Sequence, residues 1–104
     1  MNDRYRAVLK AMIDTVTNGE GQLASDVRRN LVSGKTMVGV LGAFAIKVMQ
    51  NPTSIGDDNI RALEQAGYSQ DAIFECMVAA SLASGLERIR AGLRALGETA
   101  DVAD

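Results

Sequence analysis

The sequence has no histidine and no tryptophan, and it has only one cysteine and one proline. Without histidine the chain cannot form a Ser-His-Asp triad, a Cys-His pair or a zinc site with imidazole ligands. A single cysteine excludes a disulfide within one chain. We therefore expect no metal, no cofactor and a reduced thiol, as in cytoplasmic proteins.

Charges of the two signs nearly balance, with 11 Lys and Arg against 13 Asp and Glu, so the formal net charge is -2. This balance argues against nucleic-acid binding, which needs several basic side chains on one face. The nearest basic cluster is Arg88, Arg90 and Arg94, and we interpret it as a solvated helix surface rather than an anion site.

No segment has the pattern of a membrane span or a signal peptide. The longest uncharged stretches, 36–46 and 76–86, are shorter than the roughly 18–20 apolar residues that a bilayer requires. No apolar segment follows the charged residues at the start of the chain, as it does in a signal peptide. We therefore expect a cytoplasmic protein without a membrane partner.

The chain is long enough for one domain, and 47% of its 104 residues are hydrophobic. We predict a single all-α domain over residues 1–97 and a frayed tail over 98–104. Apolar residues recur at three- and four-residue spacing, as on one face of a helix. The first helix has such a face, made of Tyr5, Val8, Leu9, Met12, Ile13 and Val16. The five predicted helices cover residues 3–17, 24–32, 37–50, 57–66 and 69–96.

The segment 37–50 is almost entirely apolar, so a buried strand competes with a helix there. Its length favours the helix, and Pro52 marks its end because the residue before a proline resists the α conformation. Asp57 and Asp58 fit a helix start better than a cation site, and Asp57 can pair with Arg61 one turn later.

The clearest start signal lies at Ser69, which predicts an N-cap, with Tyr68 and Ile73 as the hydrophobic pair that brackets it. From Ile73 to Leu86 the last helix is apolar or small on nearly every side apart from Glu75, so we expect this half to be buried all round. Such a helix needs more cover than a chain of this size easily supplies, and we predict a homo-oligomer. The small residues that would let another helix approach closely are Ala79, Ala80, Ser81, Ala83, Ser84 and Gly85.

Residues 54–75 contain a short helix that ends in Leu63-x-x-Ala66-Gly67-Tyr68-Ser69, followed by Asp71-x-Ile73 at the start of a long Ala-rich helix. This pattern resembles the second half of the alkylhydroperoxidase-D-like and carboxymuconolactone decarboxylase-like superfamily. The resemblance extends over roughly 36–96. It implies a compact all-α fold of the alkylhydroperoxidase-D-like kind and an oligomer.

The redox members of that superfamily use a Cys-x-x-Cys pair with a nearby His and a Glu, in which one thiolate attacks and the second cysteine resolves. This chain has neither the cysteine pair nor a histidine. The proposed acid/base groups of the decarboxylase branch also include a histidine that has no match here. The resemblance is therefore to short members without Cys-x-x-Cys, and it implies a fold rather than an activity.

Two adjacent residues are candidates for chemistry. Cys76 could be a peroxidatic or redox-sensing thiol, but its apolar neighbours favour a core-packing residue, because such surroundings raise the pKa of a thiol. Glu75 is the only charge between Asp71 and Glu87, so it could be a general acid or base. We favour instead a carboxylate at the exposed edge of the helix, or one paired with Lys47 or an arginine. The five methionines are interpreted as core filling.

These observations favour a non-redox, oligomeric accessory or binding protein, with a pocket for a small apolar ligand. Two alternatives stay open. One is an enzyme, either a thiol peroxidase that uses Cys76 or a decarboxylase-like catalyst that uses Glu75. The other is a structural subunit of a hetero-complex, completed by a chain that supplies a missing helix.

Overall fold

The computed structural model describes residues 3–35 and 37–97, and this part of the chain contains helices but no strand. The prediction of an all-α domain is confirmed, and the predicted helix boundaries are within two residues of those observed. The predicted tail, 98–104, lies outside the described residues. The helices are α1 (Asp3–Asn18), α2 (Ser25–Val32), α3 (Gly39–Gln50), α4 (Asp57–Gln65) and α5 (Gln70–Ala95), with a 3₁₀ turn η1 (Pro52–Ser54) between α3 and α4.

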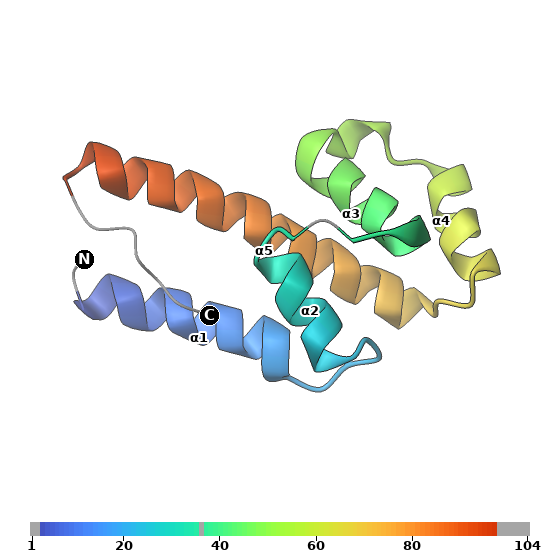
Figure 1. Ribbon diagram of the computed structural model, residues 1–104, viewed down its shortest axis with the longest axis horizontal. Coiled ribbons are helices and arrows are strands. Elements are labelled where there is room, and N and C mark those ends of the chain that lie inside the picture. The colour runs from blue at the N-terminus through green and yellow to red at the C-terminus, as the bar shows by residue number, and fades with distance from the viewer. Residues whose placement is uncertain (1–2, 36, 98–104) are drawn as a thin grey trace.

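Helix α5 is the axis of the fold, and each of the other four α-helices contacts it. Helix α1 runs beside it in the opposite direction, whereas α3 and α4 pack against its N-terminal half (Figure 1). The described chain is a slab of 45 × 28 × 18 Å. No helix in it is both long enough and apolar enough to cross a membrane.

The predicted N-cap is present at the start of α5, and Asp57 and Asp58 lie in the first turn of α4 as predicted, although the capping hydrogen bond there comes from another residue. Ser69 Oγ accepts a hydrogen bond from the N–H of Ala72 at 3.1 Å, which confirms the predicted N-cap. At the start of α4, Asn59 Oδ1 accepts a hydrogen bond from the N–H of Gly56 at 2.8 Å. Arg61 pairs with Asp58 at 3.6 Å rather than with Asp57, and both side chains are exposed, so this pair adds little stability.

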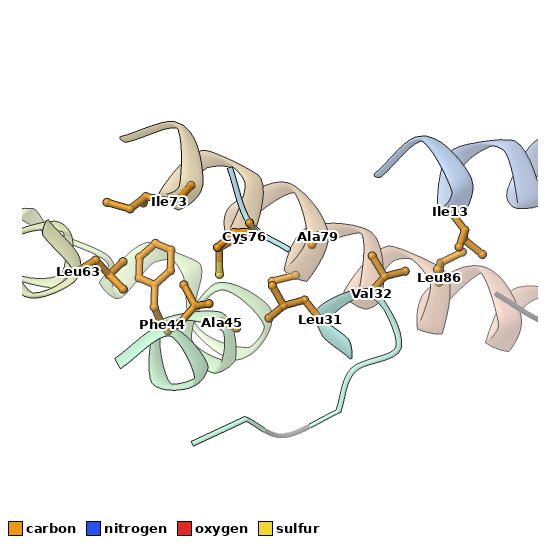
Figure 2. Close-up of a cluster of buried hydrophobic side chains, with 14 of the residues drawn as sticks. Ile13, Leu31, Val32, Phe44, Ala45, Leu63, Ile73, Cys76, Ala79 and Leu86 are labelled. Carbon is orange, nitrogen blue, oxygen red and sulfur yellow. The ribbon is translucent and has the colours of Figure 1, made fainter. Parts of the chain in front are cut away.

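The core is one elongated cluster of apolar side chains that extends along α5. Figure 2 shows Leu63 and Phe44 towards one end of the cluster, Cys76 and Ala79 in the middle, and Ile13 beside Leu86 at the other end. Each helix therefore contributes to the same core.

The prediction that α5 is buried all round as far as Leu86 is wrong. Its alanine side is covered by the chain itself, because α2 and α3 pack there and bury Ala79, Ala80 and Ala83. The opposite side is open, and Phe74 and Val78 are exposed on it. A helix in a thin slab packs against neighbours on one side only. The alanines therefore need no second copy to cover them.

The apolar face of α1 is likewise only partly buried. Leu9 and Ile13 are buried against the rest of the chain, but Tyr5, Val8 and Met12 are exposed. The predicted face is therefore wider than the surface that the core covers.

Candidate functional site

An open hollow lies where the loop between α1 and α2 meets the N-terminal half of α5. It has a volume of about 710 Å³. We call it the loop hollow, and the residues that matter for its chemistry are Glu20, Gly21, Arg28, Asp71, Phe74 and Glu75. A smaller hollow of about 190 Å³ adjoins it between α1 and α5 and shares Glu20, Arg28, Phe74 and Glu75.

Glu75 reaches from α5 to this loop and anchors it. Its carboxylate accepts hydrogen bonds from the backbone N–H groups of Gln22, at 2.8 Å, and Leu23, at 2.9 Å. Gly21 makes this approach possible, because a Cβ atom at that position would lie only 2.6 Å from Glu75 Oε1. The partners of Glu75 are therefore backbone N–H groups. Lys47 and arginine side chains, which were one of the two structural alternatives favoured from the sequence, are not its hydrogen-bond partners.

Arg28 projects from α2 into the same region and is buried, with only 7% of its surface exposed. Its Nη1 donates hydrogen bonds to the carbonyl oxygens of Val16, at 3.2 Å, and Gly19, at 2.6 Å. These carbonyls lie at the C-terminal end of α1, where the helix dipole favours a cation. Among the described residues, Arg28 Nε has no hydrogen-bond partner, and neither does the buried Thr17 Oγ1.

Arg28 is not among the site residues predicted from the sequence. The available signal is its spacing, since Arg28 precedes the buried Leu31 and Val32 by three and four residues and so lies on the inward side of α2. A buried arginine on such a short helix needs acceptors from elsewhere in the chain.

Phe74 gives the loop hollow an aromatic wall, because 61% of its surface is exposed. The lining includes three acidic residues, Glu20, Asp71 and Glu75, and one basic residue, Arg28. The hollow thus combines an apolar surface with charges of both signs.

Cys76 does not belong to this site. It follows Glu75 in the sequence but has no exposed surface and lies in the core cluster (Figure 2). Burial raises the pKa of its thiol from 9.0 to about 11. A nucleophilic cysteine acts as the thiolate, so this environment opposes peroxidase chemistry near neutral pH.

This pKa shift predicts a pH-dependent stability. The unfolded chain releases the thiol proton near pH 9, whereas the folded chain keeps it until about pH 11. The free energy of unfolding should therefore fall between these values by up to about 1.4 kcal/mol per pH unit, with no contribution from this group below pH 9. Urea unfolding of the wild type and of Cys76→Ala isolates the effect. The stability advantage of the wild type should shrink between pH 8 and pH 11, and a constant difference would contradict the shift.

The remaining sequence candidates are the acidic residues that could bind a metal ion and the methionines. In the described ranges, 3–35 and 37–97, no group of three or more Cys, Asp or Glu side chains is placed to hold a metal ion. Met37, Met49 and Met77 pack partly buried against the core, as expected, but Met12 is exposed.

Comparison of the chain with protein-family models, with curated proteins and with solved structures finds no match. The loop hollow is therefore interpreted through its own geometry.

Proposed function

We propose that the chain is a non-redox binding protein that takes a small ligand in the loop hollow. The observation that carries this proposal is that the buried cation Arg28 and the exposed ring of Phe74 line the same hollow. Concave sites that combine apolar surface with a few polar groups are typical of small-molecule binding.

The charges define the class of ligand. A simple anion would pair with Arg28 but would also meet Glu20 and Asp71, whereas a simple cation would pair with the acidic residues but would be repelled by Arg28. A zwitterion satisfies both requirements, with its carboxylate towards Arg28 and its ammonium towards the acidic rim. An apolar group on the same molecule would lie against Phe74. We therefore propose an amino acid with an apolar side chain, or a molecule of that kind.

Binding is a better match to this geometry than catalysis. Cys76 is in the core, and both carboxylate oxygens of Glu75 hold backbone N–H groups of the loop. We further propose that the chain is a branch of the alkylhydroperoxidase-D-like superfamily without its thiol centre. The support for this is the pattern in residues 54–75 together with the all-helical fold.

Titration calorimetry with L-phenylalanine and L-leucine tests the proposed function. Both should bind, whereas their N-acetyl and amide derivatives, each with one of the two charges, should bind at least about tenfold more weakly. Phe74→Ala should weaken binding by about tenfold while leaving the free energy of unfolding nearly unchanged, because the ring is exposed.

The matched control is Val40→Ala, which truncates an exposed apolar residue outside the loop hollow and should leave binding unchanged. Failure of both amino acids and of their derivatives to bind would overturn the binding site. Equal binding of the amino acids and their derivatives would overturn the zwitterion alone.

A further inference from the structure

We infer that a second copy of this chain packs on the open side of α1 and α5, with the two α5 helices antiparallel and crossing at Gly85. This inference goes beyond ligand binding, although both proposals use Phe74. The substitution that tests it lies at Gly85, outside the loop hollow, so its outcome is independent of ligand binding. It rests on the pattern of exposed residues along the two helices.

An uncharged stripe extends along the open side of α5 from its first turns to its C-cap. Its members follow one another at three- or four-residue spacing, which places them on one side of the helix. The four large side chains of the stripe are all exposed. The stripe consists of Phe74, Val78, Ser81, Gly85, Ile89, Gly92 and Leu96.

Helix α1 extends this apolar surface. Thr15 lines the smaller hollow together with Phe74 and Val78, so the open sides of the two helices adjoin there. Tyr5, Val8 and Met12 precede Thr15 by ten, seven and three residues and thus lie on the same side of α1. Because α1 runs beside α5 in the opposite direction (Figure 1), these exposed side chains continue the surface along the slab. Contiguous exposed apolar surface of this kind marks an interaction site.

The order of side chains along the stripe identifies the occupant as a second copy. In an antiparallel pair centred on Gly85, Val78 faces Gly92 of the second copy, and Ile89 faces its Ser81. Each large side chain near the centre therefore meets a small one. At the centre the two Gly85 residues face each other, which permits the closest approach. Crossed helices diverge from that point, so the ends have room for Phe74 against the second copy's Leu96.

A two-fold axis requires a self-complementary surface, and this stripe has that property. The seven stripe positions are uncharged. Arg88 borders the stripe near Gly85, where it donates a hydrogen bond to Ser84, and in this register it faces the second copy's Leu82 rather than its own counterpart. The area is also sufficient. At about 1.5 Å per residue and 10 Å width, the stripe and the adjoining side of α1 offer roughly 600 Å² per copy, the lower end of what stable interfaces bury. The outcome is a four-helix layer of two α1 and two α5 helices.

Sedimentation equilibrium tests this pairing through one substitution. At roughly 100 μM, above the micromolar dissociation constants of modest complexes, the wild type should have twice the mass of one chain. Gly85→Leu should raise the dissociation constant at least about 100-fold, because the leucine side chains of both copies would meet at the crossing point and hold the helices apart. The fold should tolerate it, since a Cβ at Gly85 meets no atom within 4 Å of its own chain.

Ala91→Leu is the matched control, because Ala91 is an exposed residue of the same helix outside the stripe. It should leave the dissociation constant unchanged. A monomeric wild type, or a dimer that Gly85→Leu does not weaken, would overturn the inference.

Cysteine cross-linking in a Cys76→Ser background tests the direction of the pairing. An equal mixture of Phe74→Cys and Leu96→Cys chains should form a mixed dimer with a flexible bismaleimide. The proposed register brings these positions within reach of such a linker, although the diverging helix ends are too far apart for a direct disulfide. Cross-linking of Phe74→Cys with itself in preference to the mixture would show a parallel pair and contradict the proposed interface.

Discussion

Replacing Glu75 with alanine is expected to lower the free energy of unfolding by about 3 kcal/mol. The carboxylate holds two backbone N–H groups of the α1–α2 loop, and hydrogen bonds to a charged group contribute about 1.5–3 kcal/mol each. The N–H of Gln22 is exposed and regains water when the carboxylate is lost, whereas that of Leu23 is partly buried and regains less. Urea unfolding measures the loss, and hydrogen exchange at Gln22 and Leu23 locates it.

Two comparison variants separate the loss of the hydrogen bonds between Glu75 and the loop from the effect of removing any negative charge from α5. Glu87→Ala removes an exposed carboxylate from the same helix and should change stability by less than about 0.5 kcal/mol. Glu75→Gln keeps one acceptor oxygen and should lose roughly half as much as Glu75→Ala. Unchanged exchange rates at the two loop amides in Glu75→Ala would show that the carboxylate does not hold the loop.

The second large effect is expected at Leu63, which has no exposed surface and is the buried residue of α4. Leu63→Ala should destabilise the fold by about 3–4 kcal/mol, because it removes a buried side chain and leaves a cavity. It should also raise the exchange rates of the α4 amides more than those of α5, since α4 would lose the side chain that packs beside Phe44 in the core (Figure 2).

Val38→Ala provides the control for this core truncation. The Val38 side chain is 97% exposed, so its truncation should cost less than about 0.5 kcal/mol. A loss at Leu63 as small as that at Val38 would mean that α4 is not attached to the core through this leucine.

The helices could be predicted because their signals are local. Ser69 caps α5 through the N–H three residues later, and Pro52 lies just beyond the end of α3. Such signals act within one turn of chain, so a single sequence contains them completely. The all-α fold follows from the same information.

The site depends on contacts that no local pattern contains. Glu75 binds amides 52 and 53 residues away, and Arg28 binds carbonyls at the end of another helix. Hydrophobic periodicity predicts which sides of a helix are apolar, but not which of two apolar sides meets the core. Ile73 and Phe74 are neighbours of similar character, yet α3 and α4 cover the first and leave the second exposed.

The anchoring of the α1–α2 loop has a consequence for ionic strength. Within the described part of the chain, Glu75 is held by neutral amides and Arg28 by neutral carbonyls, and neither forms an ion pair. Dissolved salt screens attraction between separated charges, but it has little effect on short hydrogen bonds to buried or half-buried groups. The loop should therefore keep its place in dilute and in concentrated salt. A charged solute approaching the loop hollow would meet the same rigid framework in both, and only its long-range attraction would change.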